Sequence, residues 1–327
     1  MKNQKYRMIV IIAVLCLFTI CLLPANVSAG QKKTYGDFKY CYTEENDGII
    51  LLKYKGKEKR VTIPETIDGF PVVAIGEGAF KENRYLKEAV LPETVQTIGQ
   101  RAFYACEKLK KAVLPEGITI LEIAVFDCCE ELQTVHLPQS LLSIQSAAFS
   151  FCLKLEEIEI PKNVKFIESE AFYGCRMLKK VVFPKDSRLE RIGESAFKYC
   201  RFMKEISLPD SMQILEEQAF SDNHSLQKVV FGKNSRLKEV QDGCFGDCPF
   251  LKKFTFPGNV QKVGYAIFSN NKSMKQITFQ GKVPKIEKGA FKGIHPNAIF
   301  HVPSKHKSAY KKALTKKKGF LKTMRVK

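Results

Sequence analysis

The sequence contains few of the residues, and none of the short motifs, from which catalytic sites are usually assembled. It has only five histidines in 327 residues, and none lies in a recognisable nucleophile motif with serine or cysteine. Neither G-x-S-x-G nor H-E-x-x-H occurs, and there is no glycine-rich phosphate loop. Because no acid, base and nucleophile can be nominated, we expect a protein that is not an enzyme and that uses no cofactor or metal.

The sequence also lacks an apolar run as long as an ordinary membrane-spanning helix. The longest run, from Met8 to Leu23, follows three basic residues and precedes the small residues Val27-Ser28-Ala29. This pattern predicts a signal peptide over residues 1–29, with an uncleaved anchor as the alternative. Cleavage would leave no transmembrane span, so we expect a secreted or extracellular protein, either released or associated with the cell surface.

What the sequence does contain is one unit repeated along most of its length. An anchor phenylalanine recurs every 23 residues, or twice after 25, at Phe80, Phe103, Phe126, Phe149, Phe172, Phe197, Phe220, Phe245, Phe268 and Phe291. Cysteine often follows three residues later, at Cys106, Cys129, Cys152, Cys175, Cys200 and Cys248. The pattern L-x-x-V-x-L, ended by proline, follows each anchor and predicts a short strand. A fixed period of this kind predicts stacked coils with a shared apolar interior.

The combined pattern, L-x-x-V-x-L-P-x-x-V-x-x-I-x-x-x-A-F-x-x-C, resembles the BspA-type leucine-rich repeat of secreted and surface proteins of host-associated microbes. The resemblance covers most of the chain, from about Val61 to Pro303. It implies a leucine-rich-repeat solenoid, usually an adhesive or ligand-binding surface protein with no catalysis of its own. We therefore expect a β-rich repeat solenoid of about ten 23-residue coils.

Both ends of the repeat region depart from the pattern and are expected to close the stack. Residues 30–60 contain two strand-like segments around the turn signal Asn46-Asp47-Gly48, which predicts an N-terminal β-hairpin cap before the repeats of residues 61–303. Residues 304–327 predict a basic C-terminal cap or tail, with a short helix that Ser304 caps and that runs through Tyr310 and Leu314. From residue 305 onward this segment has ten lysines and arginines and no acidic residue.

The cysteines are explained by their place in the repeat. Six of them follow an anchor phenylalanine at the same distance, and Cys244 takes the position that Ala171 fills elsewhere, so Cys244 and Cys248 need no redox or metal role. We expect buried free thiols that act as apolar filler. Disulfides between neighbouring coils are an alternative, and a zinc site would require four convergent ligands.

Recognition is expected on the outward strand positions, because the concave sheet of a solenoid is its usual binding surface. These positions are mostly lysine, with one acidic coil, and give the candidate ligand-binding face Lys87, Lys110, Lys111, Glu156, Glu157, Glu159, Lys179, Lys180, Lys204, Lys228, Lys252, Lys253 and Lys275. Such a face suits an extracellular protein or an acidic glycan, whereas a merely solvated surface is the alternative. Specific nucleic-acid binding is not expected, since these positions hold almost no aromatic residues for base stacking.

Two functions remain open from the sequence. In the first, the protein is an adhesin-like binding protein that engages an extracellular ligand through its strand face. In the second, it is a structural protein that its basic tail holds on an anionic cell-wall polymer of the producing cell. An L-P-x-T-G anchoring motif is absent, which leaves the mode of surface attachment open.

Overall fold

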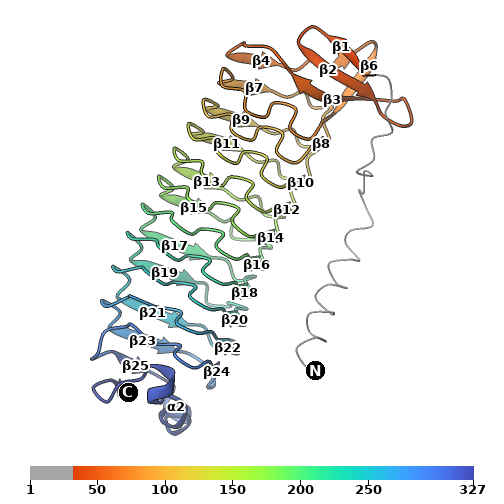
Figure 1. The fold of residues 1–327 in the computed structure, drawn as a ribbon. Helices are drawn as coiled ribbons and strands as arrows, with labels where there is room; N and C mark the ends of the chain where they lie inside the picture. The colour runs from red at the N-terminus through yellow and green to blue at the C-terminus, as the bar shows by residue number, and fades with distance from the viewer. Residues whose placement is uncertain (1–31) are drawn as a thin grey trace.

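The computed structural model describes residues 32–327, which form a rod of stacked coils (Figure 1). The predicted signal peptide, residues 1–29, lies outside the described residues. Each regular coil places one longer strand on one side of the rod and one two-residue strand on the other, and most of these strands pair in parallel with those of adjacent coils. The prediction of a β-rich repeat solenoid is confirmed. The rod has about 12 turns, more than the anchors predict, because both ends add coils of their own.

The longer strands run up the left side of Figure 1. They are β4 (Arg60–Thr62), β7 (Glu88–Val90), β9 (Lys111–Val113), β11 (Thr134–His136), β13 (Glu157–Glu159), β15 (Lys180–Val182), β17 (Glu205–Leu208), β19 (Lys228–Phe231), β21 (Lys253–Phe256), β23 (Gln276–Phe279) and β25 (Ile299–His301). Their sheet is interrupted between β11 and β13, between β15 and β17, and between β19 and β21.

The shorter strands lie on the opposite side and, from β10 onward, form one uninterrupted sheet. They are β8 (Thr97–Ile98), β10 (Ile120–Leu121), β12 (Ser143–Ile144), β14 (Phe166–Ile167), β16 (Arg191–Ile192), β18 (Ile214–Leu215), β20 (Glu239–Val240), β22 (Lys262–Val263) and β24 (Lys285–Ile286). The second residue of each strand is the aliphatic residue five positions before an anchor, and it points into the core.

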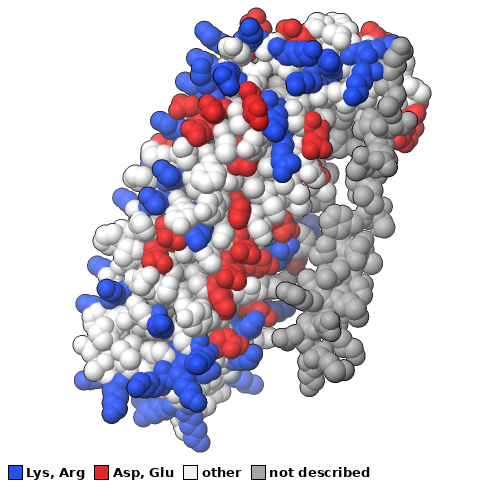
Figure 2. Space-filling model, viewed as in Figure 1, with Lys and Arg blue, Asp and Glu red and all other residues white. Residues whose placement is uncertain are grey.

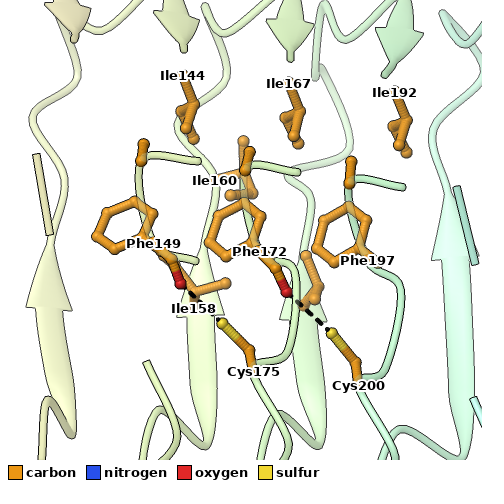
Figure 3. Packing of buried hydrophobic residues seen from close by; sticks show 14 of the residues in the cluster. Ile144, Phe149, Ile158, Ile160, Ile167, Phe172, Cys175, Ile192, Phe197 and Cys200 are labelled. Carbon is orange, nitrogen blue, oxygen red and sulfur yellow. Dashed lines mark hydrogen bonds between the residues drawn. The ribbon is translucent and has the colours of Figure 1, made fainter. Parts of the chain in front are cut away.

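The anchor phenylalanines form a column along the axis of the rod (Figure 3). The Phe172 ring stacks between Phe149 and Phe197, with ring centroids 5.2 and 5.0 Å apart. All ten anchors are buried, and each ring from Phe80 to Phe245 is stacked on the ring of the next coil. The column ends before Phe291, whose ring meets other phenylalanines edge-on. In the last coils phenylalanines also occupy inward strand positions that hold smaller aliphatic residues elsewhere, so their rings enter the column.

The cysteines that follow the anchors do more than fill space. The Cys175 thiol donates a hydrogen bond to the Phe149 carbonyl of the preceding coil, 3.1 Å away, and five other cysteines repeat this contact. Asn223 and Asn271 take the same position and donate amide hydrogen bonds of 2.9 Å to the equivalent carbonyls. The interpretation as apolar filler is therefore wrong in this respect, because the position selects a hydrogen-bond donor for a carbonyl buried in the core.

The cysteines of the described residues are all unpaired, and only Cys128 among them is not buried. Burial raises the pKa of the Cys106 and Cys175 thiols to about 12, since the charged thiolate is poorly solvated in the core. These thiols remain protonated near neutral pH, which suits their role as hydrogen-bond donors.

The N-terminal end is closed by an antiparallel sheet of β1 (Lys33–Tyr35), β2 (Phe38–Tyr42) and β3 (Ile49–Tyr54), whose last strand pairs in parallel with β6 (Phe70–Ile75). The cap extends further than the sequence predicts, because β5 (Thr66–Ile67) and β6 form a second hairpin. Asp68 and Gly69 turn this hairpin with φ angles of 53° and 82°, the left-handed conformation that tight hairpin turns require.

The C-terminal end is closed by the basic segment itself. It contains a 3-10 turn η1 (Ser304–His306), helix α2 (Lys307–Ala313), a second 3-10 turn η2 (Lys316–Lys318) and strand β26 (Arg325–Val326), which pairs in parallel with β25. The predicted role of Ser304 as a helix cap is wrong: no side chain caps either η1 or α2. Tyr310, Leu314 and Met324 are buried against the last coils, so the segment is an integral cap and not a free tail.

Candidate ligand-binding surface

The outward residues of the longer strands form an exposed surface, the strand face. Inward and outward side chains alternate along each strand, as in β13, where Ile158 is buried between the exposed Glu157 and Glu159. The thirteen candidate residues predicted from the sequence are all exposed on this face. Lysine and arginine side chains line the same edge of the molecule in Figure 2. The strand face therefore has the accessibility that a binding surface requires.

Two of the three glutamates in the acidic coil of the strand face are paired with lysines of the next coil, whereas Glu159 lies opposite Val182. In the parallel register, Glu157 lies opposite Lys180, and the two side chains form an ion pair. Lys179 contacts Glu156 in the same way at 2.8 Å, and Lys228 contacts Glu205 at 2.8 Å. Exposed pairs of this kind contribute little stability, at most about 1 kcal/mol each, but they reduce the net charge presented to a ligand.

The remaining lysines form two separate groups. Lys87, Lys110 and Lys111 lie toward the N-terminal end, whereas Lys204, Lys252, Lys253 and Lys275 lie toward the C-terminal end. No acidic side chain of the described residues forms a salt bridge with any of these seven lysines. The unneutralised positive charge of the strand face is therefore concentrated in two patches.

The second patch surrounds a hollow of about 710 Å³ that extends over β17, β19 and β21. Its lining includes Lys204, Lys228, Lys252 and Lys253, together with Glu205, so the hollow has a net charge of +3. Phe250 also lines it, with 55% of its surface exposed.

Sequence reasoning missed Phe250. It lies five residues after its anchor, a position that holds Lys108, Glu131 and Lys154 in some coils but Tyr85 and Met177 in others, so the sequence alone gave only a weak signal. Phe202 occupies the equivalent position two coils earlier and is 50% exposed, although it does not line the hollow.

A third basic surface covers the C-terminal cap, where lysine and arginine side chains gather around α2 (Figure 2). Eight of the ten basic residues from Lys305 onward are exposed, and none of the salt bridges in residues 32–327 involves this segment. The sequence prediction of a concentrated basic end thus corresponds to a folded, positively charged surface.

A second hollow, of about 520 Å³, lies where the last coils meet the C-terminal cap, and its lining includes Gln261, Lys282, Lys305 and His306. They contain no group of three or more histidine, cysteine, aspartate or glutamate residues arranged to hold a metal ion. No helix within residues 32–327 has the length and apolar character needed to cross a membrane. The two lysine patches of the strand face and the cap surface are therefore the candidate binding surfaces.

Comparison with known families agrees with the repeat geometry. A model described as a BspA type leucine-rich repeat region, with six copies, matches residues 73–201 and 190–319. The chain belongs to the BspA-type leucine-rich repeat family. The resemblance stated from the sequence is confirmed, and the match is to a repeat region and not to an enzyme domain.

Several solved structures are similar to this leucine-rich repeat protein. A leucine-rich repeat protein of T. pallidum is 28% identical, with a TM-score of 0.49 over 68% of this chain and 91% of that one. A leucine-rich cell surface protein of Faecalibacterium prausnitzii is 22% identical, with a TM-score of 0.37 over 86% of this chain and 97% of that one. The pneumococcal vaccine antigen PcpA is 19% identical, with a TM-score of 0.44 over 91% and 98% of the two chains. No curated protein matches the chain.

Proposed function

We propose that this protein is a secreted or surface-associated, non-catalytic binding protein, adhesin-like in its action, whose strand face engages an acidic extracellular protein or glycan. One observation carries the proposal: seven exposed lysines of the strand face lack an acidic partner. They project from a sheet whose backbone is already ordered, so ligand binding costs little further backbone entropy. The extracellular location rests on the N-terminal pattern of basic, apolar and small residues.

Binding to immobilised acidic macromolecules tests this function. The probes are heparin, mucin and a matrix protein, each at low and high salt, because exposed charges are screened as ionic strength rises. The test variant replaces Lys110, Lys111, Lys252 and Lys253 by glutamate. We expect it to lose at least about tenfold in affinity, since each charged hydrogen bond contributes about 1.5–3 kcal/mol.

The matched control carries the same charge change at four exposed lysines outside the strand face, Lys185, Lys233, Lys272 and Lys288. We expect this control to bind within about twofold of the unmodified protein. Equal loss by both variants would show that only net charge matters. Loss by the control alone would place binding on the turns, where the two 25-residue intervals carry two extra residues near Lys185 and Lys233, and would contradict the proposal.

A second function is favoured by the C-terminal cap. Its eight exposed basic residues, with no acidic residue in the segment, suit retention on an anionic wall polymer. Replacing Lys311, Lys312, Lys316 and Lys317 by glutamine leaves the buried contacts of the cap in place. If retention is the function, this variant is released from purified wall polymer at lower salt than the unmodified protein, whereas the strand-face variant is released at the same salt.

A further inference from the structure

The hollow over β17, β19 and β21 coincides with an interruption of the sheet. In coils on either side, the peptide N–H seven residues after the anchor donates to the preceding coil, from Gln227 to the Lys204 carbonyl at 2.8 Å and from Lys275 to the Lys252 carbonyl at 2.9 Å. Among the described residues, no equivalent bond joins the Lys252 N–H to the Gln227 carbonyl. Among residues 32–327 the same bond is also missing at the other two interruptions, at Glu156 and Lys204. Water reaches these exposed N–H groups, so a ligand with an acceptor at Lys252 takes the place of water.

The charges in the hollow specify the sign of that partner. Glu205 is engaged by Lys228 at 2.8 Å, which leaves Lys204, Lys252 and Lys253 without an acidic partner in the same hollow. Like charges brought together over low-dielectric walls repel one another and raise the local concentration of anions. An anionic group that approaches Lys252 therefore meets ammonium groups and a peptide N–H that the sheet does not use.

The aromatic ring and the size of the hollow specify the class of ligand. The exposed ring of Phe250 lies among the lysines of the hollow and provides an apolar surface. A ligand that carries only charged groups would make no favourable contact with this ring. A volume of about 710 Å³ is within the usual range for small-ligand pockets. The three coils span roughly 15 Å at about 4.8 Å per strand, so the hollow alone is much smaller than the roughly 800 Å² that a protein partner usually covers.

We propose that this hollow is a subsite for an acidic oligosaccharide. Lys204, Lys252 and Lys253 bind its carboxylate or sulfate groups, the free peptide N–H of Lys252 contributes a further donor, and Phe250 packs against the apolar face of a sugar ring. This assignment rests on the proposed function of the strand face and narrows it to one ligand class at one place. An acidic peptide is the competing ligand, and the experiment below separates the two.

Calorimetric titration of the full chain with a size-defined heparin tetrasaccharide tests the assignment. Phe250→Ala is expected to weaken binding about fivefold, and Lys252→Gln with Lys253→Gln at least about tenfold. The matched controls are Phe202→Ala, at the equivalent position outside the hollow, and Lys185→Gln with Lys288→Gln, two exposed lysines outside the strand face. Both controls are expected to bind within about twofold of the unmodified protein. All replaced side chains are exposed, so each variant is expected to remain folded. Thermal melting of each variant verifies this.

Two further probes distinguish the possible failures. The neutral maltotetraose is expected not to bind, and a glutamate-rich peptide is expected to bind weakly and without dependence on Phe250. If both lysine variants weaken heparin binding equally and Phe250→Ala has no effect, heparin responds to net charge alone and the subsite does not exist. If the peptide binds more tightly than the tetrasaccharide at this hollow, the ligand class is wrong. If no acidic probe binds the unmodified protein, the proposed function fails together with the subsite.

Discussion

Replacement of Phe172 by alanine tests the column of rings on which the rigid strand face depends. The Phe172 ring is fully buried at the middle of the column and stacked on both sides, with interplanar angles of 12° to Phe149 and 4° to Phe197. Truncation of a buried phenylalanine costs about 3–5 kcal/mol. We expect the upper part of this range, because neighbouring coils are fixed by backbone hydrogen bonds, such as the 2.8 Å bond from the Phe172 N–H to the Ala196 carbonyl, and cannot collapse into the cavity.

A loss of about 5 kcal/mol is a large part of the stability of most domains, about 5–15 kcal/mol. Denaturant titration followed by circular dichroism measures the change, with Phe202→Ala as the matched control because its ring is half exposed. Hydrogen exchange shows which coils are destabilised. Because each coil of a repeat protein contacts only its neighbours, we expect amide protection to be lost first around residue 172. If Phe172→Ala unfolds at the same denaturant concentration as Phe202→Ala, the column does not stabilise the rod as described.

Three further predictions follow from the core and the cap. Cys175→Ala is expected to cost about 1–3 kcal/mol more than Cys175→Asn in thermal melting, because only alanine leaves the Phe149 carbonyl without a donor; equal costs would contradict the donor role. Because burial raises the pKa of Cys106 to about 12 from 9.0, the folded state holds a proton that the unfolded state releases. Stability is therefore retained below about pH 9 and falls between pH 9 and 12, by up to about 1.4 kcal/mol per pH unit for each such thiol, and the fall at residue 106 is removed in Cys106→Ala. Deletion of residues 305–327 is expected to lower the melting temperature and cause aggregation, because it uncovers the coil against which Tyr310 packs; a truncated rod that melts normally would show that the segment is a dispensable tail.

Much of the fold follows from the sequence because a period is a global signal. One anchor every 23 residues forces each coil to present the same face to its neighbours, whatever the exact path of the chain. Local details are less certain, since they depend on contacts between segments distant in sequence. The hairpin of β5 and β6 joins the cap sheet, and Ser304 caps no helix, although local patterns indicated otherwise.

The residues of the strand face were predictable, but their electrostatic state was not. Alternation along each strand identifies Lys179 and Lys252 as equivalent outward residues. Only the parallel register shows that Lys179 is paired with Glu156 whereas Lys252 has no acidic partner and lines a hollow. Paired charges lie 23 residues apart in the sequence, which is one repeat. This spacing predicts the ion pairs only when the coils are known to stack in register.

The sequence by itself determined that this protein is a stack of equivalent coils with a buried aromatic column, because hydrophobic periodicity dictates which side chains must leave water. The tertiary structure alone decided where binding chemistry gathers. The interruption between β19 and β21, the exposed ring of Phe250 and the pairing of lysines with glutamates arise from how adjacent coils meet. Those contacts depend on distances between coils, which no single repeat specifies.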